Sequence, residues 1–172
     1  MSKTIVTDIE KCVACKGCEI ACALEHSASK RLEEAVRESP APQSRVAVLA
    51  NDRYSVPLQC RHCEDAPCIF VCPTLAMHRQ AVGSPVLIDR DKCIGCRACL
   101  VACPFGAIDM ARDGRAVVKC DLCLERSLRG EQPACVESCP TGAMRLCETE
   151  DLNLERRRQV AAQACDGLDK GV

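Results

Sequence analysis

Apolar residues along this chain occur in short runs separated by polar and turn-forming residues. Short runs rich in Val, Ile and Thr predict brief strands rather than long helices. Two charged stretches, residues 30–38 and 152–164, predict helices. The pattern therefore favours a small α+β fold in which loops predominate. The expected strands are residues 4–7, 45–49, 54–58, 86–88, 116–118 and 143–146.

The candidate apolar core is thin. The chain of 172 residues has no Trp, one Tyr and two Phe, so Val, Ile, Leu and Ala must supply most of the core. It has, by contrast, 18 cysteines. Bound metal must then carry much of the folding free energy.

Cysteine at this density would indicate disulfides in a short secreted chain. The N-terminal residues, however, lack the apolar segment of a signal peptide, and no run approaches the roughly 18 apolar residues of a membrane span. We therefore expect a cytoplasmic protein without a direct membrane span, in which cysteines stay reduced and bind metal. The formal net charge of -1, with basic and acidic residues mixed, argues against a nucleic-acid partner.

The most specific motif lies at residues 93–104, where four cysteines are followed by Pro104. Its spacing, C-x2-C-x2-C-x3-C-P, is that of bacterial proteins that hold [4Fe-4S] clusters. A tight loop can present three thiolates to one cluster, while the fourth lies on a short helix and reaches a neighbouring cluster. Pro104 is expected to end that helix. Iron–sulfur ligation is therefore the leading interpretation.

Three further groups share this arrangement, so sixteen of the 18 cysteines fall into four groups of four. Group one repeats the spacing, except that Ala23 stands where proline is expected and would let the helix continue towards His26. Group two has a second gap of four residues, and group four has a middle gap of eleven. In chain order the groups are Cys12, Cys15, Cys18 and Cys22; Cys60, Cys63, Cys68 and Cys72; Cys93, Cys96, Cys99 and Cys103; and Cys120, Cys123, Cys135 and Cys139.

The order of the groups predicts two ferredoxin-like units, one inserted within the other. Groups two and three are adjacent and would form an inner unit at residues 60–111. Groups one and four would form an outer unit from residues 1–59 and 112–148, with an insertion at 23–59. Pairing of residues 4–6 with residues 143–146 would close it. Residues 149–172 are expected to form a polar C-terminal helix and tail.

Within each unit, the two groups are expected to exchange their fourth cysteines. Four [4Fe-4S] clusters are thus the expected cofactors. The expected ligands, called the first to fourth set below, are Cys12, Cys15, Cys18 and Cys139; Cys22, Cys120, Cys123 and Cys135; Cys60, Cys63, Cys68 and Cys103; and Cys72, Cys93, Cys96 and Cys99.

Two cysteines remain outside the groups. Cys147 lies in an expected strand and is interpreted as a small buried apolar residue, whereas Cys165 in the tail is interpreted as a free thiol. His62, between two cysteines of group two, could donate a hydrogen bond to a cluster sulfur and raise its potential. A solvated side chain is the favoured interpretation of His62, because polar residues are usually exposed.

A lysine precedes the first cysteine of three groups: Lys11, Lys92 and Lys119. These lysines could offset the negative charge of the clusters. An ordinary surface position is the favoured interpretation for all three.

Zinc is the alternative metal. Zinc sites favour two C-x2-C pairs separated by a longer stretch, which only group four resembles. The chain has no Rossmann glycine fingerprint, phosphate loop or radical-enzyme cysteine triplet, and each expected cluster has four thiolates. We therefore expect a non-catalytic electron carrier. A substrate-reducing enzyme and a zinc-rich structural module are the rival hypotheses.

The four groups, and the segment PLQCRHCEDAPC at residues 57–68 in particular, resemble the four-cluster electron-transfer subunits of the dimethyl sulfoxide reductase type. Within that class the chain is most similar to the ferredoxin-like subunit that accompanies carbon monoxide dehydrogenase, and to the small subunits of formate dehydrogenase and formate hydrogenlyase-type hydrogenase. Residues 25–46 favour the first of these. The resemblance implies a shuttle of single electrons between such a catalytic subunit and an acceptor. An electron-transfer subunit of a molybdopterin reductase is the alternative.

Overall fold

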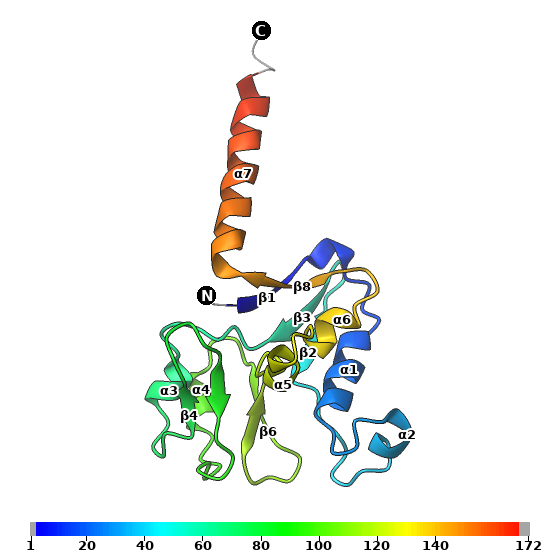
Figure 1. Ribbon diagram of the computed structural model, residues 1–172, viewed down its shortest axis with the longest axis vertical. Helices are drawn as coiled ribbons and strands as arrows, with labels where there is room; N and C mark the ends of the chain where they lie inside the picture. Colours follow the sequence, from blue (N-terminus) through cyan, green and yellow to red (C-terminus); the bar gives the residue numbers. More distant parts are fainter. Residues whose placement is uncertain (1–2, 169–172) are drawn as a thin grey trace.

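A computed structural model describes residues 3–168 as a small α+β fold with short elements and many loops (Figure 1). The strands are β1 Lys3–Thr7, β2 Val46–Ala50, β3 Ser55–Gln59, β4 Met77–Arg79, β5 Val86–Ile88, β6 Ile108–Met110, β7 Val117–Lys119 and β8 Met144–Glu148. The helices are the 3-10 turn η1 Ile9–Lys11, α1 Gly17–Glu25, α2 Leu32–Ala35, α3 Pro67–Phe70, α4 Ala98–Ala102, α5 Leu124–Leu128, α6 Ala134–Glu137 and α7 Thr149–Leu168.

The described strands pair as four two-stranded antiparallel sheets: β1 with β8, β2 with β3, β4 with β5, and β6 with β7. The first joins the N-terminal strand to the last strand of the chain, with Ile5 opposite Leu146 and Val6 opposite Arg145. This confirms the expected pairing of residues 4–6 with 143–146. The other three sheets are hairpins between consecutive strands.

Proline, or its absence, sets the length of the helices that carry cysteines. Helix α4 ends at Ala102, and Cys103 before Pro104 is already extended, as expected. Helix α1 has Ala23 at the equivalent place and continues to Glu25, with His26 as its C-cap residue. The continuation predicted from Ala23 is therefore confirmed.

The helix predicted at residues 30–38 is wrong in extent, because α2 covers only Leu32–Ala35. Lys30 has a left-handed backbone and Arg31 is extended, so the helix begins late. At its other side, Glu38 turns back and accepts hydrogen bonds from the backbone N–H groups of Ala28 and Ser29. The segment closes on itself as a loop instead of extending as a helix.

The buried residues form two separate clusters. The first core lies under β1, β8 and α1, and the second lies between α3, α4 and the hairpins β4–β5 and β6–β7 (Figure 1). Cysteines belong to both. The first core consists of Ile5, Cys18, Cys22, Val46, Val48, Cys120, Leu122, Cys135 and Met144. The second consists of Ala66, Cys68, Met77, Val86, Cys99, Ile108 and Val117.

Helix α7 projects away from the body at the upper end of the molecule in Figure 1. It begins earlier and ends later than the predicted helix at 152–164. Its described side chains are mostly exposed, and Glu155 forms an ion pair with Arg145 of β8 at 3.9 Å. Residues 1–2 and 169–172, which belong to the predicted outer unit and tail, lie outside the described residues. No helix within residues 3–168 combines the length and apolarity needed to cross a membrane.

Candidate metal centres

The loops that carry the cysteine pairs share one backbone feature. The residue before the second cysteine of each group has a positive φ: Ala14 at 55°, His62 at 50°, Gly95 at 66° and Leu122 at 58°. Three of these four are not glycine, and a left-handed backbone costs such a residue about 1–2 kcal/mol. The same backbone turn in four separate loops, costly in three of them, indicates that the loops share one task, which is to fold the chain around a centre.

The first set meets in a single cavity. The cavity is lined by Cys12, Cys15 and Cys18 of group one together with Cys139 of group four. The rest of its lining is mainly apolar, including Val48 and Met144. Helix α1, which begins just before Cys18, packs against α6, which ends just before Cys139.

The second set is largely buried. Cys22 on α1 lies in the first core with Cys120 and Cys135 of group four. Burial, followed by the nearby thiolates of Cys22 and Cys123, raises the pKa of Cys135 to about 12. Burial likewise raises the pKa of Cys123 to about 11, and Cys22 contributes to that shift. The thiols of this set are thus close enough to influence one another.

The third and fourth sets lie around the second core. Burial and the neighbouring thiolates of Cys60 and Cys103 raise the pKa of Cys68. Burial also raises the pKa of Cys99 to about 11, with contributions from Cys93 and Cys96. Two further members, Cys63 and Cys72, pack against the second core.

The paired groups approach each other at their third cysteines. Cys18 of group one contributes to the raised pKa of Cys135 in group four, and Cys68 of group two contributes to that of Cys99 in group three. Helices α1 and α6 pack together, as do α3 and α4. Group one is therefore the neighbour of group four, and group two is the neighbour of group three.

Several sulfur atoms receive hydrogen bonds. The backbone N–H of Arg45 donates to Cys22 Sγ at 3.2 Å, and that of Met77 donates to Cys72 Sγ at 3.5 Å. Burial alone would raise the pKa of Cys72, but the N–H of Met77 and the neighbouring Thr74 hydroxyl lower it below its usual value. The backbone N–H of Met144 and the Thr141 hydroxyl likewise lower the pKa of Cys139, although burial opposes them. Such donors stabilise negative charge on sulfur.

His62 differs from its favoured interpretation as a solvated side chain. Burial, and then the positive charge of Lys119, lower the pKa of His62 to about 3, so the ring is neutral. Nδ1 accepts a hydrogen bond from the backbone N–H of Val86 at 3.0 Å, which assigns the ring proton to Nε2. Nε2 is buried and has no hydrogen-bond partner. A buried donor left in this way is costly unless a further acceptor belongs to the site.

Lys119 also contradicts the favoured surface interpretation, whereas Lys11 and Lys92 confirm it. Lys11 pairs with Asp8 at 3.0 Å and Lys92 with Asp89 at 2.9 Å, and both side chains are more than half exposed. Lys119 is only 3% exposed. The sequence contains a feature that separates the two environments. Each surface lysine has an aspartate three residues before it, with which it pairs, whereas Lys119 has Ala116 at that position.

The two cysteines outside the groups are not fully buried. Cys147 is half-buried on β8 rather than fully buried, and Cys165 is exposed on α7. None of the 18 cysteines, all of which lie within the described residues, forms a disulfide.

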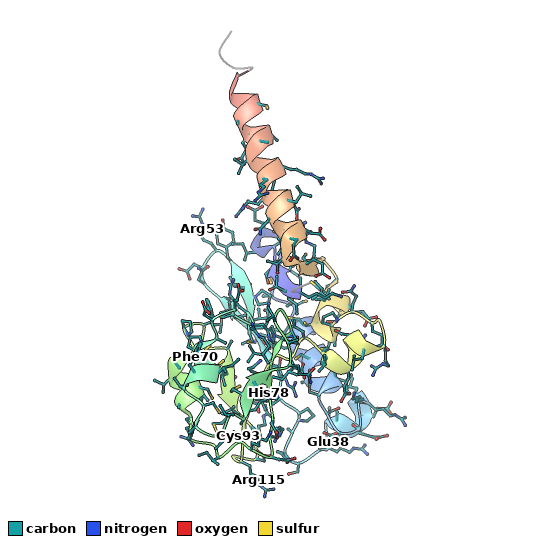
Figure 2. All side chains as sticks on the ribbon, turned by 60° about the vertical axis from the view of Figure 1, so that its left-hand side comes forward. Glu38, Arg53, Phe70, His78, Cys93 and Arg115 are labelled. Atoms are coloured by element: carbon teal, nitrogen blue, oxygen red, sulfur yellow. The ribbon has the colours of Figure 1, made fainter. Side chains whose placement is uncertain are left out.

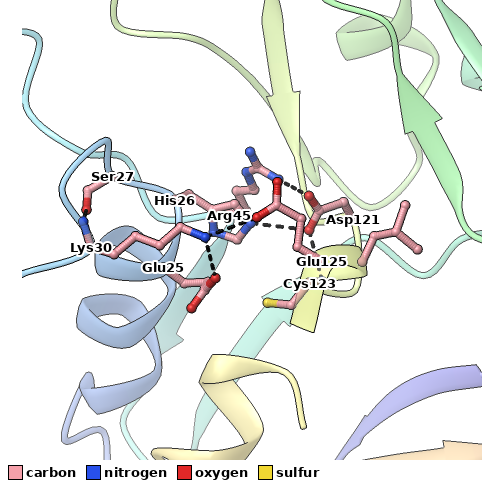
Figure 3. A pocket seen from close by; sticks show the side chains of 9 residues that line it. Glu25, His26, Ser27, Lys30, Arg45, Asp121, Cys123 and Glu125 are labelled. Atoms are coloured by element: carbon pink, nitrogen blue, oxygen red, sulfur yellow. Dashed lines mark hydrogen bonds and ion pairs between the residues drawn. The ribbon is translucent and has the colours of Figure 1, made fainter. Parts of the chain in front are cut away.

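A polar network that the sequence did not indicate lies beside the second set (Figure 3). Asp121 accepts hydrogen bonds from Arg45 and from the backbone N–H of Cys123, the latter at 2.9 Å. His26 Nε2 lies 3.3 Å from the same carboxylate, and His26 Nδ1 lies 2.8 Å from the Cys22 carbonyl oxygen. Burial alone would lower the pKa of His26. Hydrogen bonds to Asp121 and to Cys22 outweigh this effect and raise the pKa to about 9. The network ties the 23–59 insertion to group four.

His26, Asp121 and Cys123 also offer three ligand atoms within 4.8 Å of one another. Asp121 is already engaged by both His26 and Arg45, and Cys123 belongs to group four. The cysteine groups supply sixteen thiols, whereas this mixed group of histidine, aspartate and cysteine occurs once among the described residues. The donors therefore fit [4Fe-4S] clusters better: thiols in sets, N–H groups directed at sulfur, and a buried imidazole donor with no acceptor of its own.

A family model described as a 4Fe-4S dicluster domain matches residues 52–149. The chain belongs to this family. The putative electron transport protein YsaA of Escherichia coli is 37% identical to it over 162 residues, which cover 92% of this chain and 98% of the relative. The electron transport protein HydN of E. coli is 34% identical over 180 residues, covering 94% and 98%. The probable anaerobic dimethyl sulfoxide reductase chain YnfG of E. coli is 38% identical over 150 residues, covering 84% and 73%.

This chain is thus an iron–sulfur electron transport protein, and its cofactors are four [4Fe-4S] clusters, as expected. When bound, such clusters would supply one-electron redox chemistry. The cysteines of this chain would hold them, and the backbone N–H groups and charged side chains beside the sulfur atoms would set their electrostatic surroundings.

Proposed function

We propose that this protein relays single electrons through its four clusters between a partner oxidoreductase and an acceptor. The observation that carries the proposal is the cavity that Cys12, Cys15 and Cys18 share with Cys139, a residue from the far end of the chain. Such sharing is what exchanged fourth ligands require. We propose the four sets defined above as the ligands, with one unit at 60–111 inserted in another made of 1–59 and 112–148.

The contacts between neighbouring cysteine sets suggest the order in which electrons pass from cluster to cluster. Cys99 and Cys68 connect the fourth set to the third, and Cys135 and Cys18 connect the second set to the first. Between the units, Cys60 packs against the first core. The proposed order is therefore fourth, third, second and first set.

The two ends of this path reach the surface. Cys96 of the fourth set and Cys15 of the first set are exposed, unlike the buried third cysteines. Exposed apolar residues accompany them. Phe70, which stands at the surface in Figure 2, and Val101 lie in the half that holds the fourth set, and Val13 lies next to Ala14 in the cavity of the first. Apolar residues at such positions favour docking of a protein partner.

A non-catalytic role is part of the proposal, since four thiolates for every cluster leave no iron open to substrate. The proposed partners are carbon monoxide dehydrogenase, formate dehydrogenase or a hydrogenase, following the sequence resemblance. The relative named as a dimethyl sulfoxide reductase chain favours, as second candidate, an electron-transfer subunit of a molybdopterin reductase. A reducing compartment such as the cytoplasm fits cysteines that form no disulfides.

The test begins with protein purified without oxygen. Four clusters require about sixteen irons per chain, and reduction should give paramagnetic signals. The holo-protein is then mixed separately with each candidate oxidoreductase and its own substrate, and bleaching of cluster absorbance is followed by stopped flow. We expect rapid reduction by one of them, followed by reoxidation by an added ferredoxin-type acceptor.

Two outcomes would overturn the proposal. A colourless protein that contains zinc would favour the structural module and the site at His26, Asp121 and Cys123. A protein with full iron that turns over a substrate by itself with an artificial donor would instead be an enzyme.

A further inference from the structure

We propose that Lys119 and His62 raise the reduction potential of the cluster at the third set, Cys60, Cys63, Cys68 and Cys103, above that of its neighbour at the fourth set. Electrons that enter at the exposed Cys96 would then move inward. The inference rests on the ligand sets of the proposed function. It concerns residues that are not ligands themselves.

The first observation is the position of the Lys119 ammonium group. Nζ donates to the carbonyl oxygens of Val86 and Cys120, the latter at 2.8 Å, and lies 3.6 Å from Cys60 Sγ. Within the part of the chain that the structure describes, no carboxylate pairs with it. A buried cation without a counter-charge is strongly unfavourable. The negative charge of thiolates and cluster sulfide provides that counter-charge, and it increases by one when the cluster gains an electron.

The second observation is the unpartnered donor of His62, which is independent of the first. Nε2 is buried and its proton has no acceptor, while the backbone N–H of His62 donates to Cys60 Sγ at 3.4 Å. Arg79 restrains the loop, since its guanidinium donates to the His62 carbonyl oxygen at 3.0 Å. Hydrogen bonds to cluster or cysteine sulfur raise the potential.

The fourth set has a lysine directly before the first cysteine of its loop, as the second set has in Lys119, but this lysine is not buried beside a cluster set. Lys92 precedes Cys93 as Lys119 precedes Cys120, yet Lys92 pairs with Asp89 in solvent. Its charge is both neutralised and screened. At the position equivalent to His62, the fourth set has Gly95, which carries no donor side chain. Both sets receive a backbone hydrogen bond at sulfur, from Met77 at Cys72 and from His62 at Cys60, so the two sets of the inner unit differ in the buried lysine and the imidazole donor.

The experiment compares Lys119→Gln with the matched control Lys92→Gln, both in the full chain. Iron content is measured first, and each cluster is then titrated with redox mediators while its paramagnetic signal is recorded. For Lys119→Gln we expect a single cluster to become at least tenfold harder to reduce, equivalent to about 59 mV for one electron. Lys92→Gln should change every cluster by less than threefold. His62→Asn, which tolerates the left-handed backbone, should shift the same cluster as Lys119→Gln in the same direction.

Each outcome decides the matter. An unchanged potential in Lys119→Gln with full iron would overturn the inference, as would equal shifts in the two lysine variants. If Lys119→Gln loses iron, His62→Asn decides alone: a downward shift of one cluster supports the inference and no shift refutes it. Wild-type protein with far fewer than about sixteen irons would refute the proposed function instead.

Discussion

Replacing Asp121 with asparagine should weaken the attachment of the insertion to group four. The carboxylate serves Arg45 and His26 together, and the three side chains are 29%, 20% and 13% exposed. Removing one partner of a fully buried pair costs about 3–5 kcal/mol. Because these side chains retain some solvent, the expected cost is about 2 kcal/mol. The amide oxygen would still accept the hydrogen bond from the N–H of Cys123, so the measured loss of stability would report the removal of the negative charge alone.

Asp113 provides a matched control. It pairs with Arg90 at 2.9 Å and accepts a hydrogen bond from the N–H of Arg115, two residues later, just as Asp121 does from Cys123. Its pair is more exposed, at 48% and 30%, so Asp113→Asn should cost less than about 1 kcal/mol.

The assay is the rate of cluster loss in anaerobic guanidinium, because unfolding that releases metal is not a two-state equilibrium. If the whole cost appears in the unfolding barrier, about 2 kcal/mol makes Asp121→Asn lose its clusters roughly 30-fold faster. Asp113→Asn should remain near wild type. Equal rates for the two variants would refute the reasoning, since the network would then stabilise nothing beyond a surface pair.

Three further predictions concern the ligands, the turns and the metal. Cys22→Ser should make Cys120, Cys123 and Cys135 reactive to iodoacetamide, while Cys12, Cys15 and Cys18 stay protected; the opposite pattern, read by mass spectrometry, would exclude the exchange of fourth ligands. Leu75→Gly should slow thermal cluster loss by an amount equivalent to about 1 kcal/mol, because Leu75 is exposed at φ 56° and the equivalent Gly142 has φ 64°. Gly142→Leu should do the reverse, and equal effects of the two changes would contradict this account. Removal of iron by a chelator under reducing conditions should abolish most of the far-ultraviolet circular dichroism, since thiols belong to both cores; a fully folded apo-protein would show that metal contributes little.

Local signals in the sequence were sufficient for much of the fold. The β-branched run at residues 4–7 and the absence of proline at Ala23 each predicted the observed element. The sequence was less informative where the chain folds back on itself. Residues 30–38 have a helical composition, but the carboxylate of Glu38 is hydrogen-bonded to Ser29, and this tertiary contact overrides the local preference.

Side-chain environments were the least predictable part. His62 and Lys119 are of residue types that are usually exposed, and only the packing of β5 and β7 beside group two buries them. The contact between His26 and Asp121 spans 95 positions, so no local pattern could indicate it. The nested arrangement of units and the four ligand sets stay predictions until metal is located.

The pairing of β1 with β8 affects the order in which the parts of the protein can fold during synthesis. As the ribosome releases the chain from its N-terminus, the proposed third and fourth sets are complete once Cys103 has emerged. Cys12, Cys15 and Cys18 leave the ribosome first, but the proposed first set is complete only when Cys139 has emerged, and β1 can pair only once β8 has been made. With these proposed sets, the middle of the chain can bind its clusters before the N-terminal part does, and the thiols made first stay open to oxidants longest.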